Sequence, residues 1–189
     1  GEVNNINSII SPNLKYKLDS ELIFISTSKN LSLAGSAFSQ TQGNIGGELP
    51  KLYNSDYIKK LFNSIQKLIY NKKILSGHDI SSGGFITSIL EMNFSNENFG
   101  MELDLNGFKE KDLIKILFNE SPGLILQVDS KTVSELKRFK LNVIKLGKPI
   151  SNRSLIINHN YSKIKLDIDY FRDVWYKTSH LLDNFQTNK

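Results

Sequence analysis

Cysteine is absent from this chain of 189 residues. Its absence excludes disulfides, thiolate nucleophiles and cysteine metal sites, and it fits a reducing compartment, so we expect a cytoplasmic location. No run of about 18 apolar residues occurs, so no membrane-spanning helix is expected. The first ten residues, "GEVNNINSII", have no basic region followed by an apolar stretch, so no signal peptide is expected there.

Alanine and arginine are scarce, with two and three residues respectively, while lysine, asparagine and isoleucine are abundant. Lysine, asparagine and isoleucine have A/T-rich codons, whereas alanine and arginine mostly do not. This bias therefore indicates an A/T-rich genome more than selection for a basic surface. The lysines are also spread along the chain, without the basic stripe and interleaved aromatic residues of many nucleic-acid-binding proteins. The net charge of +5 therefore does not predict a nucleic-acid partner, and we expect no membrane partner either.

The composition, 39% hydrophobic and 10% aromatic, predicts a folded chain with a core large enough for one domain. We expect a single domain over 1–189, with a lead-in segment at 1–20 and the start of a linker at 186–189. Hydrophobic patterns predict strands at 21–26, 72–77, 100–105, 123–128, 142–147, 154–159 and 163–168. They predict helices from Ser55 as N-cap to about 69, from Gly83 or Gly84 to about 92, at 110–118, at 130–139 and from about Asp169. Because these elements do not alternate strictly, we predict an α+β domain: a mixed β-sheet flanked by helices.

The last predicted helix carries apolar residues at helical spacing. We expect them to form its buried face: Phe171, Val174, Trp175, Thr178, Leu182 and Phe185. Core packing is therefore the predicted role of Trp175.

The stretch "LSGHDISSGGFITSILEM" concentrates glycine and polar residues between a strand and a helix. The N–H groups at a helix start are unpaired and carry a partial positive charge, which suits a phosphate. Gly83 and Gly84 would allow a ligand to approach the backbone, and Ser81 or Ser82 can hydrogen-bond a phosphate oxygen. Asp79 is a hard oxygen ligand that can hold Mg²⁺ beside that phosphate.

A purely structural interpretation of the same turn stays open. In it Asp79 or Ser81 caps the helix, the two glycines adopt positive φ, and His78 packs against the sheet. No lysine follows the glycines as in a Walker motif, so that motif is excluded.

Two other segments have polar residues that can serve either a ligand or the fold. In "LAGSAFSQTQGNIGG", Gly35 and Ser36 can bind an oxyanion and Gln40 can reach a carbonyl or amide, although an ordinary loop has the same composition. In "FNESPG", Glu120 can be a ligand, although a helix end followed by a proline turn explains the same residues.

Catalytic residues are not predicted in this chain. His159 and His180 are isolated and fit surface or packing roles. No Ser-His-Asp or paired-carboxylate arrangement can be recognised from spacing.

As a set, the motifs "LAGSAFSQ", "GHDISSGGFITSILEM", "NESPGLILQV" and "FRDVWYKTSHLLD" resemble phosphoribosylformylglycinamidine synthase of the large, single-chain type. They occur in the family order, and the resemblance extends from about "SIISPNLK" to "LLDNFQ". It is to the second C-terminal domain of that enzyme, which is similar to the C-terminal domain of aminoimidazole ribonucleotide synthetase.

The resemblance implies a role in purine biosynthesis. The family uses ATP to activate the amide of formylglycinamide ribonucleotide as an iminophosphate, and ammonia from glutamine then displaces the phosphate. It implies that Asp79 is a Mg²⁺ ligand and that Ser81 contacts the phosphates of ATP or ADP. The implied partners are the preceding synthetase-like domains and a glutaminase domain, without which this chain is not expected to be active.

One departure and two alternatives remain. Ala34 replaces a glycine of the family's Leu-Gly-Gly-Ser, so a ligand contact that needs a bare backbone there is in doubt. Selenophosphate synthetases, hydrogenase-maturation proteins and thiamine-phosphate kinases share the two-domain plan, but the "LAGSAFSQ" loop and the ending with Trp175, Thr178 and Ser179 fit them less well. A non-catalytic interaction module is the other alternative.

Overall fold

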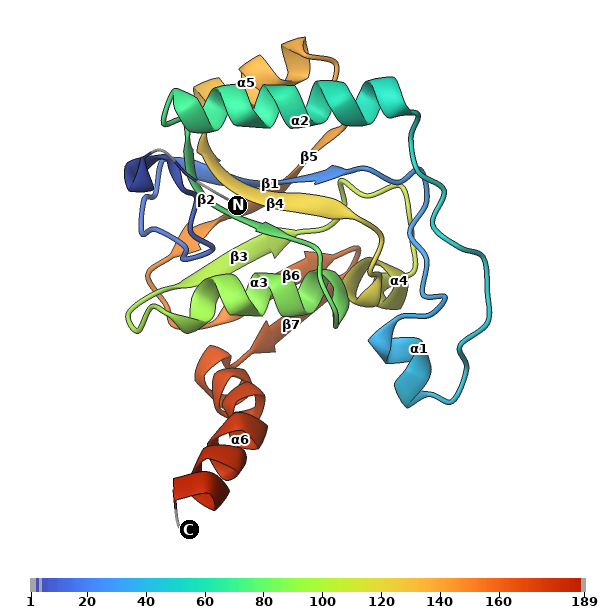
Figure 1. The fold of residues 1–189 in the computed structure, drawn as a ribbon, viewed down its shortest axis with the longest axis vertical. Coiled ribbons are helices and arrows are strands. Elements are labelled where there is room, and N and C mark those ends of the chain that lie inside the picture. Colours follow the sequence, from blue (N-terminus) through green and yellow to red (C-terminus); the bar gives the residue numbers. More distant parts are fainter. Residues whose placement is uncertain (1–2, 4, 188–189) are drawn as a thin grey trace.

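One mixed β-sheet forms the centre of the fold. The computed structural model describes residue 3 and residues 5–187. The strands are β1 (Ser20–Ser26), β2 (Ile74–Asp79), β3 (Gly100–Asp104), β4 (Gly123–Asp129), β5 (Val143–Ile150), β6 (Leu155–His159) and β7 (Ser162–Leu166). They lie in the order β2-β4-β1-β5-β3-β6-β7 (Figure 1). Strands β3 and β6 pair in parallel and the other neighbours pair antiparallel. The predicted α+β fold is confirmed.

Helices cover both faces of the sheet. A short 3₁₀ turn (Ile6–Ser8) is followed by helices α1 (Ala37–Thr41), α2 (Ser55–Tyr70), α3 (Gly84–Phe94), α4 (Leu113–Phe118), α5 (Ser130–Arg138) and α6 (Ile168–Thr187). Helices α2 and α5 lie on one face, and α3 and α4 lie on the other (Figure 1). Within β1, Leu22 and Phe24 join the core of the α3 side, whereas Ile23 and Ile25 join that of the α2 side. Burial on both faces explains why this strand is apolar at successive positions.

Side-chain caps set the starts of three helices. Asn54, and not the predicted Ser55, caps α2 by accepting from the Tyr57 N–H at 3.0 Å. Helix α4 begins three residues later than predicted because Asp112 caps it, and Asp129 caps α5. Each predicted helix exists, and the errors are confined to the ends, where one capping residue decides the boundary.

The predicted buried face of α6 is wrong. Only Ile168 of this helix is buried, and Phe171 is partly buried against the core. Trp175, Leu182 and Phe185 are 49%, 55% and 68% exposed. The helix projects away from the sheet (Figure 1), so its apolar residues continue beyond the elements that could cover them.

Arg153 links the start of α6 to the rest of the domain through hydrogen bonds. One guanidinium nitrogen, Nη1, donates to the Asn93 carbonyl at 2.9 Å and to Asn96 Oδ1 at 3.0 Å. The other, Nη2, bonds Asp169 Oδ1 at 2.9 Å. This largely buried arginine therefore joins α6 to the end of α3.

Three of the sequence motifs adjoin the sheet at the same end of its strands. Strand β2 is an edge strand, and Asp79 at its end pairs with Leu124 of β4. Ser26, at the end of β1, pairs with Gly123 at the start of β4. The "LAGS" loop, the β2–α3 turn and the "NESPG" turn therefore adjoin the same end of these three neighbouring strands.

Within the described residues, no helix is long and apolar enough to cross a bilayer. The predicted lead-in at 1–20 and linker start at 186–189 include residues outside those described, namely 1–2, 4 and 188–189. The predicted domain limits stay a prediction.

Candidate functional site

Two consecutive glycines make the turn between β2 and α3. Gly83 has φ 87° and Gly84 has φ 80°, as the structural interpretation of this turn predicted, and L side chains rarely adopt such values. A Cβ on Gly84 would lie 2.7 Å from the Phe118 carbonyl carbon and 2.8 Å from the Asn119 oxygen. Both the conformation and the approach of α4 therefore require glycine at this position.

The N–H groups that open α3 are already bonded to protein oxygens. The Gly83 N–H donates to Glu120 Oε1 at 2.8 Å. Those of Gly84 and Phe85 donate to backbone carbonyl groups at 3.0 Å and 3.2 Å. The expectation of unpaired donors at this helix start is therefore wrong for these three groups.

Glu120 joins two of the motif loops. Its Oε1 also accepts from the Ala37 N–H, at 2.9 Å, so one carboxylate oxygen bonds the start of α1 and the start of α3. Negative charge is favourable at a helix start. The "NESPG" segment thus supplies an internal anion to the other two loops, a role that goes beyond the predicted helix end.

The "LAGS" loop uses its polar groups for its own structure. The Ser36 hydroxyl accepts from the Ser39 N–H at 3.2 Å and donates to the Leu33 carbonyl at 2.7 Å. Gln40 Nε2 donates to the Gly35 carbonyl at 3.0 Å. Through the bond from Ser39, the Ser36 hydroxyl caps α1, and Ser36 is only 1% exposed. The structure therefore favours the ordinary-loop interpretation of this segment.

Asp79 and Ser81 lie together and reach solvent. The Ser81 hydroxyl donates to Asp79 Oδ2 at 3.2 Å, and the Asp79 side chain is 71% exposed. Neither side chain caps α3, because the N-cap is Gly83 and the Gly83 N–H bonds Glu120 instead. The structural alternative is therefore wrong in its capping role, and both groups keep lone pairs for a ligand.

This pair fits a magnesium ion only as part of a larger ligand set. Among the described residues, no three His, Cys, Asp or Glu side chains are grouped to hold a metal. Mg²⁺ is commonly bound by one or two carboxylates together with phosphate oxygens and water. Asp79 therefore fits as one ligand, with the remaining ligands from a nucleotide, water or another domain.

His78 is held by a residue that the sequence did not single out. Its Nε2 lies 3.0 Å from Glu91 Oε2, and the other Glu91 oxygen accepts from Trp175 Nε1 at 3.1 Å. Trp175 is half exposed and contacts the Phe94 ring, so the predicted core role is wrong. The only available signal was a glutamate placed among the apolar residues of α3.

The other two histidines stand apart from this turn. His159 is 5% exposed at the end of β6, with its Nδ1 3.4 Å from Asn160 Nδ2. His180 lies on the exposed part of α6, with its Nε2 3.1 Å from Asn184 Nδ2. These positions match the predicted packing and surface roles.

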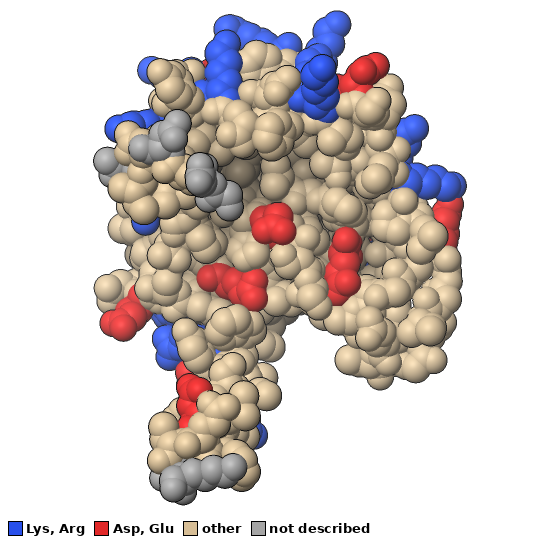
Figure 2. Space-filling view, viewed as in Figure 1, with Lys and Arg blue, Asp and Glu red and all other residues tan. Residues whose placement is uncertain are grey.

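Charge is distributed unevenly around the turn. On the face in Figure 2, most Lys and Arg side chains gather over the side of α2 and α5, and separate Asp and Glu side chains lie across the middle. A hollow of about 360 Å³ adjoins the turn and is lined by His78, Asp79 and apolar residues. A bound cation would therefore meet little competing positive charge on this part of the surface.

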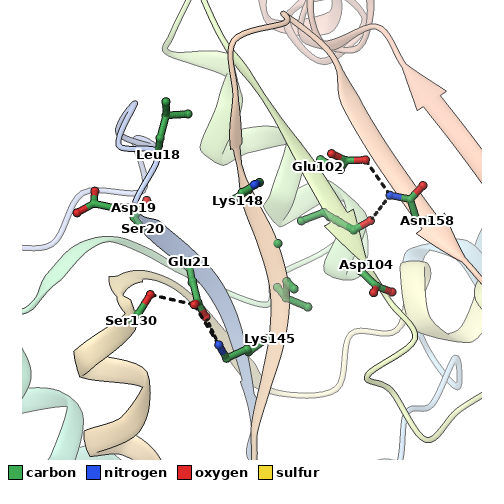
Figure 3. A pocket seen from close by; sticks show the side chains of 13 residues that line it. Leu18, Asp19, Ser20, Glu21, Glu102, Asp104, Ser130, Lys145, Lys148 and Asn158 are labelled. Carbon is green, nitrogen blue, oxygen red and sulfur yellow. Dashed lines mark hydrogen bonds and ion pairs between the residues drawn. The ribbon is translucent and has the colours of Figure 1, made fainter.

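A second hollow, of about 470 Å³, lies over β1, β5, β3 and β6 (Figure 3). Glu21 accepts from the Ser130 hydroxyl at 2.9 Å and pairs with Lys145 at 2.7 Å. Burial raises the pKa of Glu21, but the bonds from Lys145 and Ser130 outweigh it and hold the pKa below its ordinary value. Glu21 and Lys145 pair with each other, and no residue of the four motifs lines this hollow, so it is not the candidate site.

Comparison with known proteins finds relatives over most of the chain. The sequence pattern of the family described as AIR synthase related protein, C-terminal domain, matches residues 19–150. A protein of Arabidopsis thaliana named probable phosphoribosylformylglycinamidine synthase, chloroplastic/mitochondrial, is 32% identical over 192 residues, covering 96% of this chain and 13% of the relative. Probable membrane antigen 3 of Saimiriine herpesvirus 2 is 28% identical over 177 residues, covering 90% of this chain and 14% of the relative.

Solved structures of Thermotoga maritima PurL share the fold. PurL complexed with FGAR has a TM-score of 0.69 at 10% identity, covering 88% of this chain and 30% of PurL. PurL complexed with ADP has a TM-score of 0.63 at 11% identity, covering 87% and 27%. The chain thus spans about a seventh of the curated relatives' length, and the resemblance read from the four motifs is confirmed.

Proposed function

The chain belongs to the family of AIR synthase related C-terminal domains, and from this premise we propose that it is one domain of a phosphoribosylformylglycinamidine synthase. The whole enzyme would convert formylglycinamide ribonucleotide, glutamine and ATP to formylglycinamidine ribonucleotide in the cytoplasm. This chain would be its second synthetase-like C-terminal domain. A glutaminase domain and ATP-binding synthetase domains would complete the enzyme.

The convergence of four motifs on one turn carries the proposal. Glu120 bonds the turn to the "LAGS" loop, and Glu91 bonds it to Trp175 of the last motif. The turn that these contacts hold carries the exposed pair of Asp79 and Ser81. An arrangement in which long-range contacts support exposed polar groups is typical of a binding site.

In this proposal the chain supplies one wall of a Mg²⁺–nucleotide site. Asp79 would hold the metal, which neutralises phosphate charge when bound. The Ser81 hydroxyl, now donating to Asp79, would turn to donate to a phosphate oxygen. The N–H groups of Gly83, Gly84 and Phe85 would not contribute, since they are already bonded within the protein. No catalytic residue is assigned to this chain.

A second candidate is a non-catalytic interaction module. It is favoured by the internally satisfied start of α3 and by a relative named as a membrane antigen. In that case the four motifs would preserve a stable turn without a ligand. The two candidates differ in whether Asp79 and Ser81 matter once folding is accounted for.

The test measures ADP binding, with and without Mg²⁺, by calorimetry on the complete polypeptide that contains this domain. We expect Asp79→Ala to weaken Mg²⁺-dependent ADP binding by at least about tenfold and Ser81→Ala by about tenfold. Ser82→Ala is the matched control, since Ser82 is an exposed neighbour with no hydrogen bond among the described contacts. Wild-type binding in both Asp79→Ala and Ser81→Ala would reject the site and favour the interaction module.

A further inference from the structure

Glu91 connects three elements of the fold through a single carboxylate. It lies on α3, one oxygen is 3.0 Å from His78 Nε2 on β2, and the other accepts from Trp175 Nε1 on α6 at 3.1 Å. The side chain is 24% exposed. Both oxygens therefore have partners, and the carboxylate is held between two aromatic rings in one orientation.

The His78 ring, which Glu91 holds on one side, contacts the main chain of Asp79 on the other. Its second ring nitrogen, Nδ1, lies 2.6 Å from the Asp79 carbonyl oxygen. The Ser88 hydroxyl donates to that same oxygen at 3.0 Å. The peptide unit after Asp79 is thus held from two sides, while the carboxylate itself points to solvent and is 71% exposed.

We infer that Glu91 is a positioning residue for Asp79, acting through the His78 ring to aim the Asp79 carboxylate at the metal. The inference rests on the proposed function, in which Asp79 is a Mg²⁺ ligand. Mg²⁺ demands nearly ideal octahedral geometry, so a ligand on a loose turn must lose conformational entropy when it binds. A turn that is ordered in advance lowers this cost.

The alternative role for Glu91 is to stabilise the packing of α6 against α3 and β2. Under that role, substitution would reduce the stability of the domain, and any effect on ADP binding would be the same with and without Mg²⁺. A positioning role makes a narrower prediction. Substitution of Glu91 should reduce only the gain in ADP affinity that Mg²⁺ provides, and it should have no such effect when Asp79 is already replaced.

The experiment uses the complete polypeptide and compares Glu91→Ala, Glu91→Gln, Asp79→Ala and the double variant Asp79→Ala/Glu91→Ala. ADP affinity is measured by calorimetry in Mg²⁺ and in a chelator, and melting temperatures are recorded without nucleotide. We expect Glu91→Ala to reduce the gain in affinity that Mg²⁺ provides by about tenfold, the usual scale for a residue that orients a metal ligand. Glu91→Gln should recover most of it, because the amide can accept from Trp175 and donate to a neutral His78 ring.

In the Asp79→Ala background, Glu91→Ala should cause no further loss of the Mg²⁺-dependent affinity. Equal losses in Mg²⁺ and in chelator, or additive losses in the double variant, would overturn the inference and leave Asp79 as a ligand. Wild-type Mg²⁺ dependence in Asp79→Ala would instead reject the proposed function, and the positioning role of Glu91 with it.

Discussion

The carboxylate of Glu120 and the N–H of Gly83 lie 2.8 Å apart, although the two residues are 37 positions apart in sequence. The same oxygen accepts from Ala37, so two N–H groups at two helix starts depend on one side chain. This contact holds the β2–α3 turn in place independently of any ligand.

Loss of the Glu120 carboxylate should destabilise the domain. Glu120→Ala leaves two partly buried donors without an acceptor, and we expect a loss of about 2 kcal/mol in the free energy of unfolding. Glu120→Gln keeps an acceptor oxygen and should cost about half as much. Urea unfolding measures both values, and equal losses would show that the oxygen acceptor is not the stabilising group.

Gly84 should be far less tolerant of alanine than Gly35. Both have positive φ, but a Cβ on Gly84 meets the backbone of α4, whereas a Cβ on Gly35 meets nothing within 4 Å. We expect Gly35→Ala to cost about 1 kcal/mol from its conformation and Gly84→Ala about 3 kcal/mol, since crowding adds to it. Thermal or urea unfolding compares the two, and similar losses would contradict the close approach of α4.

The link between Arg153 and Asp169 should give the domain part of its acid sensitivity. The hydrogen bond from Arg153 lowers the pKa of Asp169 below its ordinary value. A lowered folded-state pKa stabilises the protein above the unfolded value, and this stability is lost as the pH falls below about 4.

Between about pH 5 and about pH 3, a range that brackets the ordinary aspartate pKa of about 4, Asp169→Asn should therefore lose less stability than the wild type. The carboxylate is 45% exposed, so solvent screening limits the difference to about 0.5 kcal/mol. Unfolding at several pH values measures it, and added salt should reduce it. An unchanged pH slope in the variant would contradict the assignment.

Substitutions along α6 should separate its anchored start from its projecting end. Leu182→Ser should change the free energy of unfolding of this chain by less than about 0.5 kcal/mol, because Leu182 is 55% exposed. Ile168→Ala should cost about 3 kcal/mol, because Ile168 is 0% exposed in the core. A large loss in Leu182→Ser would show that the end of α6 packs on the domain in solution.

Local contacts made most of the fold and part of the site predictable. The apolar residues of β1 and β4 and the glycines before α3 carry signals within a few positions, and the closeness of Asp79 to Ser81 follows from their spacing. The short helix α1 was missed because five residues, capped by Ser36, show no helical pattern in a glycine-rich segment.

Long-range contacts could not be predicted from the spacing of residues in the sequence. Trp175 and Glu91 are 84 positions apart, and their bond depends on how α6 leaves β7 and crosses α3. Hydrophobic spacing predicts that α6 is amphipathic, but it does not say whether any element covers that face. Two of the satisfied N–H groups at the start of α3 likewise depend on Asn119 and Glu120, which follow α4 and whose position the sequence did not specify.

The order of strands in the sheet has a consequence for folding. Strand β1 lies inside the sheet between β4 and β5, yet both of these partners are made about a hundred residues later in synthesis. The apolar segment "ELIFIS" therefore stays unpaired until most of the chain has left the ribosome. Such non-local pairing slows folding and exposes strand edges to aggregation. Nascent chains that stop before β5 should depend on chaperones to remain in solution.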